Sequence, residues 1–117
     1  MRQINYVQNG MGKPAAEEFI DSLDEGAQKK IFFVLSLAKD CGLLPAQYFK
    51  KLKGTDGIWE FRIQMNGQIY RLLCFWGHGN SLVLTHGFKK KTKKTPKGEI
   101  EIAERWKKMY FQSNPNK

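Results

Sequence analysis

A glutamate and two arginines lie in strand-like stretches of the chain, where they could act on a phosphate group. Glu60 and Arg62 alternate with apolar residues over 58–65, and Arg71 lies in the mostly apolar stretch that follows. A long cation among apolar residues needs a carboxylate partner or an anionic ligand. The Asn66-Gly67 turn predicts a hairpin that brings Arg71 close to Glu60 or Arg62. Two hypotheses remain open: a structural Glu60–Arg71 ion pair, and a phosphate-binding pair of arginines that Glu60 tunes.

Lysines form the second chemical feature. Five of the six residues 89–94 are lysines, at the end of the last predicted strand, and such a cluster focuses a positive field. Together with lysines of an earlier strand-like stretch that begins near Lys50, it predicts a basic groove at the rim of the sheet. A solvated loop with no further role is the alternative. The lysines expected to bind a polyanion are Lys51, Lys53, Lys91, Lys93 and Lys94.

The net charge also favours a polyanionic partner. The chain carries 20 Lys and Arg against 11 Asp and Glu, a formal net charge of +9. Residues 1–45 are nearly neutral, so the excess lies in residues 46–117. A one-sided positive surface attracts polyanions, of which nucleic acid is the commonest. A merely soluble, lysine-rich protein is the alternative.

Histidine and cysteine offer less chemistry. The chain has two histidines, and neither has cysteine or carboxylate at ligand spacing, so we expect no metal site. Alternation along the last strand places His86 on the same side as Leu84 and Phe88, which favours a buried imidazole over an exposed base. The sequence shows no catalytic triad and no glycine-rich phosphate loop. Cys41 and Cys74 are expected to be buried thiols in a reducing cytoplasm.

Apolar periodicity and turn residues predict the elements that position these side chains. A strand over about 2–8 precedes helices over about 14–24 and 25–41, which form an antiparallel hairpin. Strand-like stretches follow at 48–53, 58–65, 68–76 and 82–88. Thr95 and Pro96 are typical of the N-cap and first turn of a helix that runs to about 111. The order β-α-α-β-β-β-β-α predicts an α+β fold, with helices on one face of a mainly antiparallel sheet.

Length and composition predict one domain. The chain has 117 residues, of which 41% are hydrophobic and 13% aromatic, which argues against disorder. We expect a single domain over 1–112 and a flexible tail over 113–117. No stretch approaches the roughly 18 consecutive apolar residues of a membrane span, and the N-terminus lacks a secretory signal. Cytoplasmic location without membrane association is therefore expected.

Several of these segments, taken in order, resemble the RelE/ParE superfamily of toxins of type II toxin–antitoxin systems, in its phage-derived HigB-like branch. The resemblance implies a RelE-like fold and an mRNA endonuclease that acts on the ribosome without a cofactor. It also implies a cognate antitoxin, often a helix-turn-helix protein, as partner. The segments that carry the resemblance are Lys51 to Gly54, Ile58 to Ile63, Gly67, Tyr70 to Leu73, Leu82 to Lys90, Lys94 to Pro96, Glu99, Ile100 and Ala103.

The resemblance also implies residue roles. Relatives activate a ribose 2′-OH against the adjacent phosphate, which requires a base, a cation for the developing charge and an acid. Arg71 matches the arginine that stabilises the phosphate in the transition state, and Arg62 lies where relatives place a basic residue that orients it. Lys89, Lys90 and Lys91 lie where relatives carry basic residues and are candidates for the acid, and Glu60 and His86 both remain open as the base.

Two functions from other classes stay open. A ParE-like toxin poisons gyrase without cleaving RNA, although such relatives tend to lack the cationic set that this chain keeps in Arg62 and Arg71. A non-catalytic nucleic-acid-binding module is the second alternative.

Overall fold

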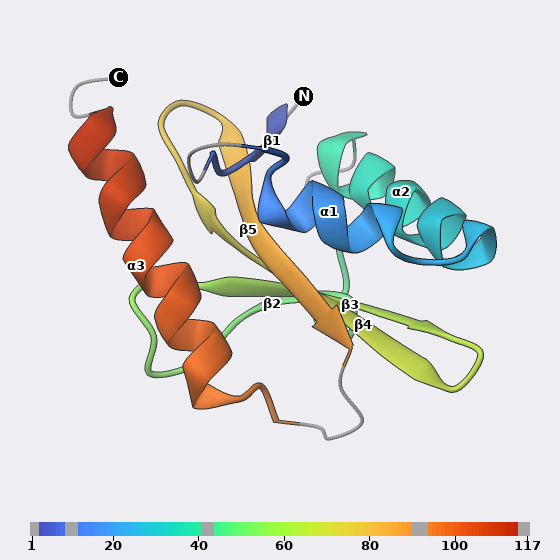
Figure 1. Ribbon diagram of the computed structural model, residues 1–117. Helices are drawn as coiled ribbons and strands as arrows, with labels where there is room; N and C mark the ends of the chain where they lie inside the picture. The colour runs from blue at the N-terminus through green and yellow to red at the C-terminus, as the bar shows by residue number, and fades with distance from the viewer. Residues whose placement is uncertain (1–2, 9–11, 41–43, 90–93, 115–117) are drawn as a thin grey trace.

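The computed structural model describes residues 3–8, 12–40, 44–89 and 94–114, and it has the predicted α+β order (Figure 1). Five strands form one sheet in the order β1-β5-β4-β3-β2, with β1 parallel to β5 and the other pairs antiparallel. The strands are β1 Gln3–Tyr6, β2 Phe49–Lys51, β3 Trp59–Met65, β4 Gln68–Trp76 and β5 Ser81–Lys89. The helices are α1 Ala15–Asp21, α2 Glu25–Asp40 and α3 Lys97–Ser113.

Helices cover both faces of the sheet, so the prediction that they share one face is wrong. In Figure 1, α3 lies on one side of the sheet while α1 and α2 lie on the other. Leu72 and Cys74 of β4 belong to the core beneath α1 and α2, whereas Leu73 and Phe75 belong to a second core that includes Ala103 of α3. A strand with apolar residues on both faces needs cover on both sides. The nearly continuous apolar run of β4 was the sequence signal for this arrangement.

The C-terminal helix is longer than predicted. α3 reaches Ser113, beyond the expected end near 111 and into the expected tail. Both the backbone N–H and the side-chain amide of Asn114 donate to the carbonyl of Tyr110, at 3.0 and 2.9 Å. These bonds satisfy a carbonyl of the last turn, which stabilises the helix end. Residues 115–117 of the predicted tail and Cys41 lie outside the described residues.

A bulge in β5 changes the side of the sheet that His86 faces. Leu73 pairs with His86 but the next residue, Cys74, pairs with Leu84, so Thr85 is the extra residue. An extra residue reverses the alternation of the strand. His86 therefore faces α3, opposite to Leu84, and the prediction that both share a side is wrong. The two-residue alternation of apolar and polar residues in the sequence does not show where a strand contains an extra residue.

In this position His86 joins β5 to α3. Its Nε2 lies 3.0 Å from Oε1 of Glu99, and its Nδ1 lies 3.1 Å from the hydroxyl of Thr85. The ring meets Trp106 edge to face, with centroids 5.6 Å apart. Burial lowers the pKa of His86, although the hydrogen bond and charge of Glu99 oppose the shift. The predicted buried, hydrogen-bonded imidazole is therefore confirmed.

Helix α1 lies so close to β5 that residue 87 has no room for a side chain. A Cβ atom at Gly87 would lie 2.3 Å from Cδ2 of Phe19 and 2.6 Å from Cδ2 of Leu72. Both neighbours belong to or pack against the core beneath α1 and α2. The glycine therefore sets the distance between α1 and the sheet.

We expect Gly87→Ala to destabilise the protein by about 1–3 kcal/mol, because the new methyl group overpacks this contact. Gly98→Ala is the matched control: its Cβ would meet no atom within 4 Å, and it lies in α3. The control is expected to be neutral or to stabilise by up to about 1 kcal/mol. Urea unfolding of both variants measures the difference, and equal midpoints would contradict the tight contact.

We expect acid to destabilise the wild type more than His86→Gln. Because the pKa of His86 is lower in the folded than in the unfolded state, the unfolded chain binds the proton more readily. The stabilising contribution is complete above the ordinary pKa of about 6.5 and is lost as the pH falls towards the folded value. Melting temperatures at pH 7.5 and 5.5 test this, and an equal loss in both proteins would show that His86 does not contribute.

Candidate active site

Glu60 is the centre of a buried polar cluster on the α3 face of the sheet. Its side chain is 1% exposed. Oε2 accepts a short hydrogen bond from the hydroxyl of Thr95 and lies 3.5 Å from Nη1 of Arg71. Oε1 lies 3.8 Å from Nε of Arg62. The carboxylate thus holds two cations and the chain just before α3.

The β3–β4 hairpin brings the two arginines together. Asn66 and Gly67 both have positive φ, 51° and 76°, as a tight two-residue hairpin turn requires. The register that follows places Arg62 directly opposite Arg71. The predicted hairpin is confirmed, and the Glu60–Arg71 ion pair, one of the two hypotheses left open, is present.

The two arginines differ in their access to solvent. Arg71 is 0% exposed, and its Nη1 donates a 3.0 Å hydrogen bond to Thr95 Oγ1. The side chain of Arg62 is 25% exposed, and its buried Nε has no hydrogen-bond acceptor within the described residues. In this conformation Arg62 can contact an anion from solvent, whereas Arg71 lies beneath Thr95. Direct contact between Arg71 and a phosphate stays a prediction.

Thr95 is the residue of this cluster that the sequence did not indicate. The helix begins after Pro96, which is its N-cap residue and makes no side-chain capping bond. The predicted capping role of Thr95 is therefore wrong, because its hydroxyl bonds Glu60 and Arg71 instead. A Thr-Pro pair before a helix looks the same in sequence whether the hydroxyl caps the helix or reaches across to a strand.

A basic groove lies over Glu60. It has a volume of about 420 Å³. Lys50 lies directly opposite Glu60 across the β2–β3 pair. The predicted lysines Lys51 and Lys53 meet Lys94 there, from segments more than 40 residues apart. The groove is lined by Lys50, Lys51, Leu52, Lys53, Glu60, Lys94, Thr95 and Ile100.

The remaining predicted residues are placed in part. Lys89 is exposed at the end of β5, opposite Tyr70. Lys90, Lys91 and Lys93 lie outside the described residues. His86 shares a cross-strand row with Glu60, with Leu73 between them, which separates their backbones by two strand spacings, roughly 10 Å. Its Nε2 points to Glu99 rather than to Glu60.

The described residues contain neither a cluster of metal-ligating side chains nor a membrane-spanning helix. No group of three or more His, Cys, Asp or Glu side chains there is arranged to hold a metal ion. No helix within those ranges has both the length and the apolar character needed to cross a membrane.

Comparison with known proteins identifies a family and a similar fold. Residues 18–108 match the family described as phage-derived protein Gp49-like (DUF891). Among solved structures, the chain is similar to the archaeal RelE–RelB complex from Pyrococcus horikoshii OT3, with a TM-score of 0.52 and 10% sequence identity, over 80% of this chain and 98% of that chain. At this identity the likeness concerns the fold. A search of curated proteins returns no match.

The family match extends from α1 into α3 and so includes every described residue of the Glu60 cluster. Because it spans most of the chain, the protein belongs to the phage-derived Gp49-like family, a family of RelE-like toxins, as the sequence resemblance predicted.

Proposed function

We propose that the protein is the toxin of a type II toxin–antitoxin system and cleaves mRNA on the ribosome without a metal ion. The observation that supports this most is the groove over Glu60, which four lysines line together with one buried carboxylate, and Nε of Arg62 lies 3.8 Å from that carboxylate. Lysines that follow a groove suit a single-stranded polyanion. The antitoxin is proposed from the neighbouring fold, whose solved structure is a RelE–RelB complex.

The proposed reaction is attack of a ribose 2′-OH on its adjacent phosphate. The new bond joins the 2′ oxygen to phosphorus, the bond to the 5′ oxygen breaks, and the products carry a cyclic phosphate and a 5′-OH. Arg62 is assigned to the phosphate, because its side chain is partly exposed beside Glu60. Positive charge is worth most where the transition state gains negative charge.

The buried Arg71 has a supporting role in this proposal. From beneath Thr95 it holds the Glu60 carboxylate in place and adds positive potential under the groove. A groove lysine, or Lys89 or Lys90, is the candidate acid that protonates the leaving oxygen. Glu60 is the preferred candidate base, because it lines the groove, whereas His86 faces Glu99.

We expect Arg62→Ala and Arg71→Ala to fail in different ways. Arg62→Ala should lower cleavage about a hundredfold and stability by about 1 kcal/mol or less, because a partly exposed cation is lost. Arg71→Ala should cost about 3–5 kcal/mol of stability, because a buried carboxylate loses its partner. Thermal melting and mapping of cellular mRNA 5′ ends after expression without the neighbouring gene measure both effects.

Two results would contradict this assignment. If Arg62→Ala cleaves mRNA like the wild type, Arg62 does not act on the phosphate. If the wild type arrests growth while mRNA stays intact, the protein is not a ribonuclease, and a non-cleaving toxin is the better interpretation.

The groove lysines should set the salt dependence of RNA binding. We expect Lys50→Gln, Lys51→Gln and Lys53→Gln, combined, to lower the slope of log K against log salt by roughly 2, at about 0.7 per lost phosphate contact. The control combines Lys13→Gln, Lys29→Gln and Lys39→Gln, which are exposed on or beside α1 and α2. Equal slopes for the two triple variants would place the RNA on another surface.

A further inference from the structure

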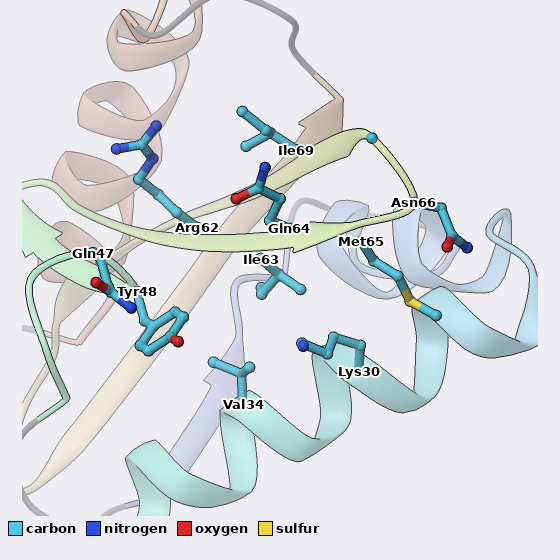
Figure 2. Close-up of a pocket in the computed structure, with 11 residues that line it drawn as sticks. Lys30, Val34, Gln47, Tyr48, Arg62, Ile63, Gln64, Met65, Asn66 and Ile69 are labelled. Atoms are coloured by element: carbon cyan, nitrogen blue, oxygen red, sulfur yellow. The ribbon is translucent and has the colours of Figure 1, made fainter.

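A second hollow adjoins the candidate active site at the edge of β3. It has a volume of about 630 Å³, within the usual range of roughly 300–1,000 Å³ for small-ligand sites. Arg62 lines this hollow and its Nε lies 3.8 Å from Oε1 of Glu60, so the hollow and the Glu60 cluster have this residue in common. In Figure 2, Tyr48 and Lys30 point into the space beneath β3, while Arg62 and Gln64 lie on the other side of the strand. The hollow therefore wraps around the strand edge.

The backbone edge of β3 is open where it borders this hollow. β2 pairs only with residues 59–61 of β3, because the chain before it turns at Pro45, whose carbonyl accepts the N–H of Tyr48. The N–H of Arg62 points to this edge, since it donates to the carbonyl of Tyr48 at 2.8 Å. By the alternation of a strand, the N–H and C=O of Gln64 point the same way. In the described part of the chain no strand pairs with the edge at 63–65.

The lining indicates the chemical class of the ligand. It contains two cations, Lys30 and Arg62, and no carboxylate. The amide side chains of Gln47, Gln64 and Asn66 offer both donors and acceptors. Tyr48 is an aromatic ring that is 40% exposed. A negatively charged ligand with a flat ring and hydrogen-bonding edges fits this set, and a nucleotide has all three properties.

We propose that this hollow holds a nucleotide of the RNA substrate next to the phosphate that is cleaved, with its base stacked on Tyr48. The inference rests on the proposed function and adds a subsite to it. The RNA strand runs from the lysine groove past Arg62 and around the edge of β3. Lys30 binds the next phosphate, and the amides with the open peptide groups of Gln64 read the edge of the base, as proteins read single-stranded RNA.

A peptide strand added to the open edge is the competing occupant. Apolar residues that could receive its side chains, Phe33 and Leu37 among them, line a small adjoining hollow of about 130 Å³, which shares Lys30, Val34 and Tyr48 with the larger one. The larger hollow is polar and cationic, and it is joined to the candidate active site through Arg62. These properties favour RNA over a peptide.

The test uses the full chain and a fluorescein-labelled A6 RNA hexamer with 2′-O-methyl groups throughout, which has no attacking hydroxyl. Fluorescence anisotropy measures its Kd. Tyr48→Ala should raise the Kd roughly tenfold or more, the effect of losing one base–aromatic stack. Tyr48→Phe, which keeps the ring, should restore most of the affinity. Phe32→Ala is the matched control, since this ring is 50% exposed on α2 but does not line the hollow.

Cleavage gives a second measurement. In mRNA 5′-end maps, Tyr48→Ala should change the base preference at a position flanking the cut, while Phe32→Ala should not. If Tyr48→Ala fails to fold, a variant of the exposed Lys30 tests the subsite in its place. Lys30→Gln should lower the slope of log K against log salt by roughly 0.7.

The outcomes separate the subsite from the function. If the wild type neither binds the hexamer nor cleaves mRNA, the proposed function fails and the subsite fails with it. If the wild type binds the hexamer and cleaves mRNA but the folded Tyr48→Ala variant binds RNA as well as Phe32→Ala does, only the subsite is overturned. The same conclusion follows if Tyr48→Ala does not fold and Lys30→Gln leaves the salt slope unchanged. If Tyr48→Ala weakens binding of the antitoxin and not of RNA, the hollow is a protein interface and the subsite is again overturned.

Discussion

A buried ion pair is the constraint around which the candidate site is organised. Arg71 and Glu60 are 0% and 1% exposed, and the transfer of two charges out of water is costly unless each finds partners. Thr95 contributes a hydroxyl that binds both side chains, and it comes from the chain just before α3. The ion pair therefore joins the β3–β4 hairpin to the start of that helix. A buried polar group that loses its hydrogen-bond partner lowers the stability of the protein. The need to keep these hydrogen bonds therefore holds the chain just before α3 against the sheet.

The same side of the sheet carries a second link between strand and helix. The bulge at Thr85 turns His86 towards Glu99, in the first turn of α3. Two polar contacts, one at Thr95 and one at Glu99, thus fix the N-terminal end of α3, while Ala103 and the aromatic residues after it pack on the apolar core. The polar end of the interface is also the end at which the basic groove opens. Structure and proposed chemistry therefore depend on the same residues.

Arg62 connects the two hollows of the molecule. It faces the Glu60 carboxylate on one side and lines the hollow at the edge of β3 on the other. Its position follows from the short length of β2, which leaves the edge of β3 open after Arg62. The strand predicted over 48–53 would reach no further along this edge than Tyr48, whose carbonyl already accepts the N–H of Arg62, so it too would leave residues 63–65 of the edge open. The early turn at Pro45 is thus what makes the hollow accessible.

Much of the architecture was determined by local sequence. The apolar alternation of residues 58–65 and the Asn66-Gly67 turn predicted the hairpin, the shared face of Glu60 and Arg62, and the approach of Arg71 to one of these two residues. Strand period and turn geometry suffice for this because they act over a few residues. The resemblance to RelE-like toxins was also carried by short motifs. Their catalytic roles stay predictions, since the fold similarity says nothing about reactivity.

Tertiary structure alone decided which arginine is accessible, where His86 points and what Thr95 binds. Each of these depends on a contact between different elements of the fold. Thr95 and Glu60, which form a hydrogen bond, are 35 residues apart in the sequence. The contact of His86 with Glu99 joins the sheet to α3. One extra residue in β5 reversed the side that a period of two assigns to His86. The sequence pattern of a strand shows which side chains share a face of the sheet, but the burial of that face depends on the element that packs against it. Here the cover is α3, whose position the sequence pattern did not contain.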